Sequence, residues 1–577
     1  MNFRFLLPFL TCASILPAAR AVAQESVREL PRGYFSAPMT HKRVLAGTFG
    51  ELREGHFHAG DDLKTQFVIG KEVLAPAQGY VYRASVSWGG YGRALYIRHP
   101  NGYTTVYGHL DRFAPRIDSL VRARQYERQS YAVDVVFDPQ DIPVEKGERV
   151  AWSGNTGGSM GPHLHFEVRR TRDNMTMNPG LFGLAADDHR APTVEGVYLM
   201  NTEGSDTMET LSDPRRIVFG KDGKSARITA RGKVAFLIDA YDTMDDAPNH
   251  NGVYGIDLYV DGQKAYGMRM NGFYFEHTGL IDRHIAYDYY ARKGKRLIKC
   301  FVEPFNTLTL YDTLTRVSPI LDVRPGSQHH VRIEVSDLAG NIARREITVM
   351  GAQTPGGYTP RHTAQADEFD HLLPFSHDRH NRIRYGRFEA DFPEGTFYKD
   401  LVFGFQAIDS MTFRLHNRLV PLRRAFTVRF DVSHLPPELQ EKAVVATPYR
   451  RRDGSTGYSY RGGTVEQGRL TLRTSAPGVF TVALDTLPPT IERGAWLPGK
   501  KLPGRYLRVY VRDGQTGMAS FRVLVDGKWV LADYEYKRRE LTLDTEREHI
   551  APGSHTLRVE VTDGAGNTSV LQEHFIR

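Results

Sequence analysis

One stretch decides the fold of the first part of the chain: Gly161-Pro162-His163-Leu164-His165-Phe166-Glu167-Val168. Its apolar residues alternate with two histidines and a glutamate. On a β-strand this alternation turns the apolar side chains into a core and places His163, His165 and Glu167 on the opposite face. Two imidazoles on one face can share a metal site, or one can bind metal while the other contacts substrate. Glu167 either supports such a site or is simply solvated.

A second piece, His58-Ala59-Gly60-Asp61-Asp62, strengthens the case for a metal. The His-x-His spacing alone is weak, because the chain contains 22 histidines. Here, however, an imidazole and a carboxylate stand four residues apart, and both are good zinc ligands. Two histidines and one carboxylate leave the fourth zinc position open for water, which is the catalytic pattern. On chemistry alone Asp61 or His56 could serve in place of Asp62 or His58.

A third piece, Tyr107-Gly108-His109-Leu110, follows a predicted hairpin. The runs Ala94–Arg98 and Tyr103–Tyr107 flank Pro100-Asn101-Gly102, and Asn-Gly between two such runs favours a tight β-turn. If alternate residues from Tyr103 to His109 share one face, His109 lies at the rim of the sheet.

Together the three pieces resemble the lysostaphin-type (LytM-like) zinc endopeptidases of peptidoglycan, whose marks are His-x-Gly-x-Asp, Tyr-x-His-Leu and Gly-Pro-His-Leu-His-Phe-Glu. The resemblance covers roughly 150 residues. It implies one Zn²⁺ per chain that activates a water molecule, and it places Asp61 and His56 at variable positions. The implied zinc ligands are His58, Asp62 and His165, and the implied catalytic pair is His109 and His163. The division of labour within that pair is left open.

The chain departs from the family pattern between His109 and His163, where the usual connection is short. A segment from Pro115 to Pro139 intervenes. We expect either a wall or flap over the substrate groove or a plain surface hairpin.

An internal repeat organises the rest of the chain. One copy ends in Val331–Asp337 followed by Ala339-Gly340-Asn341, and the other in Leu557–Asp563 followed by Ala565-Gly566-Asn567. Short alternating runs joined by Gly, Asp and Asn turns predict β-sandwiches that resemble the immunoglobulin-like modules of bacterial envelope proteins. Two interpretations of the acids remain open: Asp337 and Asn341, or Asp563 and Asn567, form an Asx-type turn or bind calcium.

Composition agrees with an exported, modular protein. The 577 residues amount to about four domains, and 41% hydrophobic with 25% charged residues excludes wholesale disorder. Residues 1–23 have the pattern of a signal peptide, so that Cys12 leaves and Cys300 stays without a disulfide partner. The net charge of +8 favours anionic surfaces, and the runs Arg450–Arg452 and Lys537–Arg539 are solvated hairpins or binding patches.

The sequence therefore predicts a mainly β protein: a small antiparallel β-sheet metallopeptidase domain followed by β-sandwich modules. The predicted divisions are a signal peptide (1–23), a zinc metallopeptidase domain (24–190), an immunoglobulin-like module with insertions (191–350), a linker (351–364), a β-rich region of unknown role (365–485) and a second immunoglobulin-like module (486–577).

The predicted function is that of an exported zinc endopeptidase of the periplasm or cell envelope that cuts peptide crosslinks of peptidoglycan. The alternative is a non-catalytic envelope regulator or scaffold that activates other wall hydrolases or binds envelope proteins through its sandwiches. Nucleic-acid binding is not expected, nor is a transmembrane helix in the mature chain.

Overall fold

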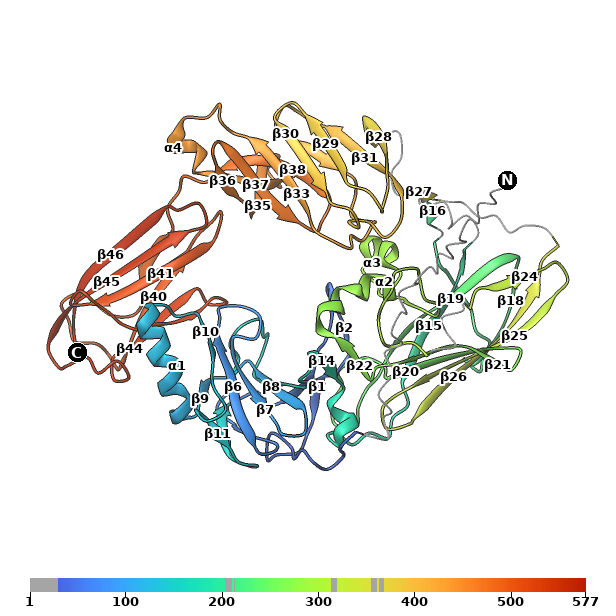
Figure 1. The fold of residues 1–577 in the computed structure, drawn as a ribbon, viewed down its shortest axis with the longest axis horizontal. Coiled ribbons are helices and arrows are strands. Elements are labelled where there is room, and N and C mark those ends of the chain that lie inside the picture. The colour runs from blue at the N-terminus through green and yellow to red at the C-terminus, as the bar shows by residue number, and fades with distance from the viewer. Residues whose placement is uncertain (1–29, 203–209, 212, 313–318, 354–360, 363–367) are drawn as a thin grey trace, which may run out of the picture.

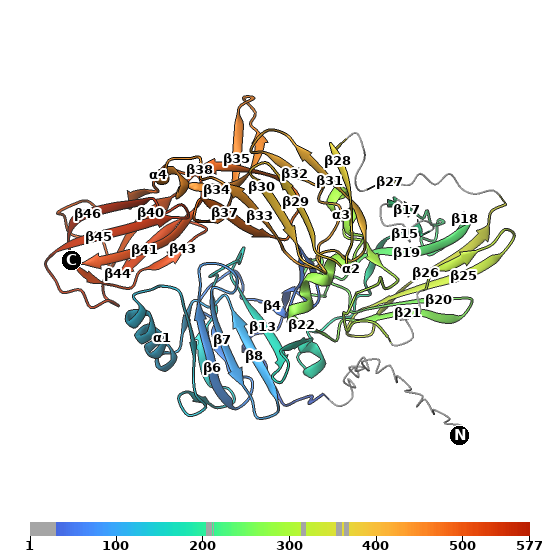
Figure 2. The same cartoon turned by 45° about the horizontal axis from the view of Figure 1, so that its top comes forward.

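The computed structural model describes residues 30–202, 210–211, 213–312, 319–353, 361–362 and 368–577. The predicted signal peptide and most of the predicted linker lie outside these residues. The fold class is mainly β, as expected. Figures 1 and 2 show four groups of strands that follow one another around a ring, so that the first and last groups lie side by side. None of the described helices is long and apolar enough to cross a membrane.

An antiparallel sheet forms the first group, and β22 continues it through β14. In spatial order its main strands are β1 (Leu45–Gly47), β4 (Asp61–Lys64), β13 (His163–Arg170), β8 (Tyr103–Gly108), β7 (Arg93–Arg98), β6 (Gly79–Val86) and β10 (Val133–Val136). Strand β11 (Pro143–Val144) pairs with β6, and β14 (Met175–Met177) pairs with β13. A smaller sheet contains β5 (Glu72–Leu74), β12 (Arg149–Trp152) and β9 (Arg112–Phe113), and β2 (Leu52–Arg53) pairs with β3 (His56–Phe57).

The hairpin around Asn101-Gly102 is confirmed, because β7 and β8 pair with Leu95 opposite Tyr107. The segment Pro115–Pro139 is neither a wall or flap over the substrate groove nor a plain hairpin. It forms helix α1 (Pro115–Arg128) and edge strand β10, at the end of the sheet farthest from β4. A proline at the first helical position and buried residues on one helical face explain why a helix forms there.

The next group contains the first copy of the repeat and is joined to the first sheet. One of its sheets contains β17 (Arg215–Arg216), β15 (Thr193–Asn201), β19 (Gly232–Tyr241), β23 (Ile298–Lys299) and β24 (Leu321–Val323). The other contains β18 (Ser225–Ala230), β26 (Ile342–Gly351), β25 (Gln328–Ser336), β20 (Gly255–Val260) and β21 (Gln263–Arg269). In sequence, β21 is followed by β22 (Gly272–Tyr274), η3 (Phe275–Leu280), α2 (Ile281–His284) and α3 (Tyr287–Lys293). Strand β16 (Thr210–Leu211) pairs with β27 (Arg361–His362).

The third group is a pair of sheets from the β-rich region. The strands of one are β28 (His371–Phe375), β31 (Leu401–Ala407), β32 (Phe413–Leu415), β38 (Gly478–Leu484), β34 (Ala443–Arg450) and β35 (Thr456–Gly462). The other contains β29 (Asn381–Tyr385), β30 (Phe388–Phe392), β33 (Phe426–Asp431), β37 (Arg469–Thr474) and β36 (Thr464–Glu466), with α4 (Pro437–Gln440) nearby in sequence. Phenylalanine rings fill much of the core between them.

The fourth group is the second copy of the repeat. Its sheets are β39 (Thr490–Arg493), β40 (Tyr506–Arg512), β44 (Glu540–Asp544) and β43 (Asp533–Glu535), and β42 (Lys528–Trp529), β41 (Met518–Val525), β45 (Ser554–Asp563) and β46 (Thr568–Ile576). The two copies share a turn in detail: Asp261 and Asp526 have positive φ and accept hydrogen bonds from His330 N and Thr556 N. The domain divisions remain predictions, and one core crosses the division at 190.

The second copy closes the ring against the first sheet. Arg93 pairs with Asp533 at 2.6 Å and Arg122 of α1 with Glu548 at 3.0 Å. The Tyr126 ring meets the Trp529 ring edge-on, with centroids 5.0 Å apart. The inserted helix therefore serves as a contact surface for the end of the chain.

Candidate functional site

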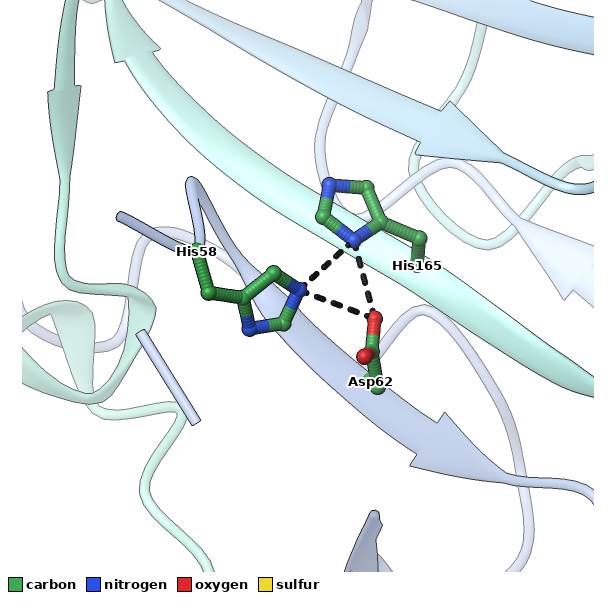
Figure 3. A group of neighbouring side chains, drawn as sticks. All are labelled: His58, Asp62 and His165. Atoms are coloured by element: carbon green, nitrogen blue, oxygen red, sulfur yellow. Dashed lines mark hydrogen bonds and ion pairs between the residues drawn. The ribbon is translucent and has the colours of Figure 1, made fainter. Parts of the chain in front are cut away.

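The pairing of β4 with β13 brings the predicted ligands together (Figure 3). Asp62 stands directly opposite His165, so both side chains point to the same face of the sheet. His58 reaches the same point from the turn before β4, because Gly60 lets the backbones approach closely. A Cβ at Gly60 would lie 2.2 Å from the carbonyl oxygen of Phe166.

Three ligand atoms form a compact triangle. His58 Nε2 lies 3.0 Å from both Asp62 Oδ1 and His165 Nδ1, and His165 Nδ1 lies 2.9 Å from Asp62 Oδ1. A tetrahedral zinc site with bonds of 2.0–2.2 Å separates ligand atoms by roughly 3.3–3.6 Å. A small outward adjustment would fit a zinc ion, and two nitrogens with one carboxylate oxygen are the donors that zinc prefers.

Neighbouring groups fix the direction of each lone pair. His58 Nδ1 donates a hydrogen bond to Thr48 O at 2.8 Å, which leaves the lone pair of Nε2 free for a metal. Glu167 Oε1 lies 2.8 Å from His165 Nε2 and accepts a hydrogen bond from it, so that Nδ1 carries the lone pair when the ring is uncharged. Arg53 binds the other oxygen of Asp62 at 2.5 Å, so Oδ1 faces the histidines.

The alternatives that spacing left open lie elsewhere. Asp61 stands opposite Phe166 and points away from the triangle, where its Oδ1 accepts the N–H of Phe49 at 3.0 Å. Burial raises the pKa of Asp61 to about 7. His56 is exposed and bonds to Glu54 O. Neither side chain is in the group that could hold the metal.

Glu167 is fully buried, so a solvated role is wrong. Tyr91 donates to its Oε1 and Arg169 to its Oε2, each at 2.5 Å. These partners, together with Arg53, were missed from the sequence. Of these residues, the sequence offers a signal for Arg169 alone: it lies two residues after Glu167, so on a strand the two side chains share one face.

His109 reaches the site differently from the expectation. Tyr107 packs on Phe166 in the core, so alternate residues of β8 face away from His165. The backbone of His109 is left-handed, with φ of 59°, and the chain turns there toward the site. Gly108 leaves the space that the His165 side chain occupies, since a Cβ would lie 3.2 Å from it. His109 is buried rather than at the rim.

Both predicted catalytic histidines are held at Nδ1 by one loop, residues 154–162. His109 Nδ1 donates to Thr156 O at 2.8 Å. His163 Nδ1 lies 2.8 Å from Gly161 O and 3.1 Å from Ser159 Oγ. The two rings are 4.7 Å apart, and His163 Nε2 is 3.4 Å from Asp62 Oδ1. Burial and the charges of His165 and His163 lower the pKa of His109 to about 3, so its ring is uncharged at neutral pH.

Lys537 of the second copy holds the 154–162 loop from outside. Its Nζ donates to Gly157 O at 3.2 Å and Ser159 O at 3.1 Å, and also to Asn155 O. The predicted basic hairpin is thus not simply solvated, because one of its three cations docks beside the site.

The first copy of the repeat holds the other side of the site. Phe273 contacts the rings of Phe49 and Phe57, with centroids 5.1 and 5.3 Å away. Thr278 Oγ1 accepts the N–H of Phe57 at 2.9 Å. The segment that leads into His58 and carries Arg53 is therefore anchored in another core.

Comparison with known proteins places this geometry in context. Residues 56–126 match Peptidase family M23, and residues 373–485 match a Zu5-like domain. An uncharacterized metalloprotease of Haemophilus influenzae is 43% identical over 144 residues, which are 24% of this chain and 25% of that protein. The DD-carboxypeptidase/endopeptidase Mpg of Neisseria meningitidis is 31% identical over 24% of this chain and 26% of its own length.

A lipoprotein NlpD of Yersinia enterocolitica is 31% identical over 17% of this chain and 78% of its own length. Among solved structures, the catalytic domain of lysostaphin from Staphylococcus simulans is 25% identical, with 25% of this chain and 91% of that chain covered and a TM-score of 0.19. The chain spans about a quarter of the length of the first curated relatives it matches.

Metal uptake should depend on pH through His165. Burial lowers its pKa, but the hydrogen bonds that it donates to the carboxylates of Asp62 and Glu167, together with their charges, outweigh burial and raise the pKa to about 9. The protonated ring has no lone pair for a metal, so below about pH 9 each ion must displace a proton. We expect zinc affinity to fall about a hundredfold from about pH 8 to about pH 6, measured by competition with a zinc-binding dye. Constant affinity over that range would contradict this role of His165.

Metal retention should also depend on Phe273. Phe273→Ala removes the ring between Phe49 and Phe57 and should lower the thermal midpoint, as a large cavity costs about 3–5 kcal/mol. It should also weaken zinc binding about tenfold, because the segment before His58 loosens. Phe480→Ala, in the separate core of the β-rich region, is the matched control and should change the thermal midpoint alone. Equal zinc affinity in both variants would show that the anchor does not support the site.

Proposed function

Because this chain belongs to peptidase family M23, we propose that it is an exported zinc-dependent endopeptidase that hydrolyses peptide crosslinks of peptidoglycan in the periplasm or cell envelope. One observation carries the proposal: His58, Asp62 and His165 offer three ligand atoms to one point, and His109 and His163 adjoin it. The named activities of the M23 relatives, a DD-carboxypeptidase/endopeptidase and a peptidoglycan DD-endopeptidase, support the substrate class.

When bound, zinc would activate a water molecule and polarise the scissile carbonyl. The chain's own part is to move protons and stabilise charge. His109 offers an uncharged Nε2, because its Nδ1–H is committed to Thr156 O, and is suited to accept the proton of the attacking water. His163 has oxygens near both ring nitrogens, Gly161 O and Asp62 Oδ1, which suits a donor toward the developing oxyanion.

The alternative is a non-catalytic envelope regulator or scaffold. It is favoured by the large share of the chain that lies outside the matched peptidase region. It does not account for the two histidines beside the ligand triangle, since a regulator needs no proton acceptor. Replacement of His163 separates the two functions.

The first experiment is digestion of purified peptidoglycan with the zinc-loaded chain, followed by mass spectrometry of released fragments. We expect fragments cut at one type of peptide bond, which names the bond. His163→Ala should abolish release, with a loss of about a hundredfold or more, while keeping its zinc. Chelation of zinc should also abolish release. A His163→Ala variant with unchanged activity, or a zinc-loaded chain that releases nothing, would favour the regulator.

Lys537 should act on catalysis through the 154–162 loop. Lys537→Ala frees the carbonyls of Gly157 and Ser159, and the loop that orients both histidines loses its outer support. We expect kcat to fall about tenfold with KM and zinc content unchanged, and partial rescue by Lys537→Arg. The neighbouring Arg538→Ala is the control, because that side chain is mostly exposed. An unchanged kcat, or a parallel loss of zinc, would contradict a positioning role.

A truncation after Ala185 would not be a clean test of whether the first sheet is active by itself. It would remove Phe273 and Lys537 together, and both hold segments of the site. Point variants in the full chain separate the two contributions.

A further inference from the structure

The two copies of the repeat each gather three aspartates at one point, outside the peptidase site. The equivalent residues come from the same three places in each copy. The first aspartate lies four residues before the proline that opens the copy, the second directly follows β19 or β40, and the third begins Asp-x-Ala-Gly-Asn. The two sets are Asp188, Asp242 and Asp337 in the first copy, and Asp485, Asp513 and Asp563 in the second.

The geometry of each set suits a single ion. In both, one carboxylate oxygen from each aspartate lies within 4.8 Å of the other two. That limit is about twice a calcium–oxygen bond of 2.3–2.6 Å, so one Ca²⁺ can reach all three. The donors are all oxygens, which favours calcium over zinc.

The Asx-type turn predicted at the third aspartate is present in both copies, and it orients the cluster. Asp337 Oδ1 accepts the N–H of Asn341 at 2.9 Å, and Asn341 Nδ2 donates to Asp188 O at 3.3 Å. Asn567 makes the same bonds to Asp563 and to Asp485 O, at 2.8 and 2.9 Å. Each turn thus ties the third aspartate to the segment that carries the first.

A buried side chain without a partner adds an independent sign of a ligand in the first copy. Asn251 is 2% exposed, and neither its Oδ1 nor its Nδ2 has a hydrogen-bond partner within the described residues. Its backbone exchanges two hydrogen bonds with Asp242, so the two side chains point to the same side of this pair. Asp188 Oδ2 is likewise buried without a donor. In the second copy the comparable residue is Gln515, two residues after Asp513: it is partly buried, its Nε2 donates to Tyr460 Oη at 2.8 Å, and its Oε1 has no partner within the described residues.

The carboxylates of the clusters accept hydrogen bonds from uncharged backbone N–H groups, such as Thr243 N, Gly340 N and Ala565 N. In the part of the chain that the structure describes, none of the six aspartates forms an ion pair with a lysine, arginine or histidine. Burial, together with the charges of Asp188 and Asp337, raises the pKa of Asp242 to about 7. Grouped carboxylates of this kind repel one another unless a cation lies between them.

We propose that each copy of the repeat binds one Ca²⁺, through Asp188, Asp242 and Asp337 in the first copy and Asp485, Asp513 and Asp563 in the second. Asn251 Oδ1 completes the first site from the protein. A cavity of about 50 Å³ beside that site, lined by Asp188, Asp242 and Asp337, leaves room for water ligands. The proposal is independent of the peptidase activity.

The place of the two ions gives them a structural role. Asp188 and Asp485 lie in the segments that enter each copy, and the other ligands lie inside the copies. Each ion therefore fixes an entering segment against its module. The first cavity is also lined by Leu45, Thr48 and Asp61, so that ion holds the first copy against the peptidase sheet.

The test is calcium titration of the full, zinc-loaded chain in calcium-free buffer, by calorimetry and by tyrosine-sensitised Tb³⁺ luminescence. We expect two ions per chain and a higher thermal midpoint in calcium. Asp337→Asn and Asp563→Asn should each bind one ion, and the double variant none. Asparagine keeps the oxygen that forms the turn, and far-UV circular dichroism checks the fold. If Asp337→Asn does not fold, Asp242→Asn replaces it.

The matched controls are Asp261→Asn and Asp526→Asn, which remove the same charge from the shared β-turn and should keep both ions. The proposal is overturned if the unaltered chain takes up no calcium at about 10 mM Ca²⁺, a concentration above the Kd of the weakest extracellular calcium sites. The proposal is also overturned if the double variant still binds two calcium ions. If the unaltered chain binds a single ion, the proposal fails for the copy whose aspartate-to-asparagine variant does not change calcium uptake.

Discussion

The pairing of β4 with β13 is the constraint on which the site depends. It sets Asp62 opposite His165 and turns Asp61 to the other face. A shift of this register by one residue would exchange the two aspartates and replace the predicted metal ligand Asp62 with Asp61. Gly60 protects the register, because any side chain there would collide with the carbonyl of Phe166. The ligand directions set by Thr48, Glu167 and Arg53 have meaning only once this pairing exists.

The site is supported by three parts of the chain. The first sheet supplies the ligands and the two histidines. The first copy of the repeat packs Phe273 against the segment before His58, and the second copy places Lys537 on the loop that orients His109 and His163. These contacts come from modules that contain neither the ligand triad nor the two histidines. The modules therefore do more than extend the molecule, since they hold the two backbone segments that flank the ligand triangle.

Much of the fold and the residues that meet at the candidate site could be predicted from sequence, because strand alternation and short motifs are local. The face of β13 and the β7–β8 hairpin followed from period-two patterns. The choice of Asp62 over Asp61 required family resemblance, since spacing does not encode register. The position of His109 was predicted for the wrong reason, because one left-handed residue reverses the alternation. The contacts of Lys537 could not be predicted, as its partners lie about 380 residues away.

The closure of the ring has a consequence for biosynthesis. Arg93 and Asp533 are separated by 440 residues, and the Lys537 contacts span nearly as many. Such contacts form late, since both partners must have been made and the long intervening chain must be ordered before they meet. The N-terminal sheet can pair its strands as soon as they emerge from the ribosome, but its 154–162 loop stays without outer support until the last tenth of the chain exists. An incomplete or clipped polypeptide would therefore carry every predicted ligand and still lack the finished arrangement of its histidines.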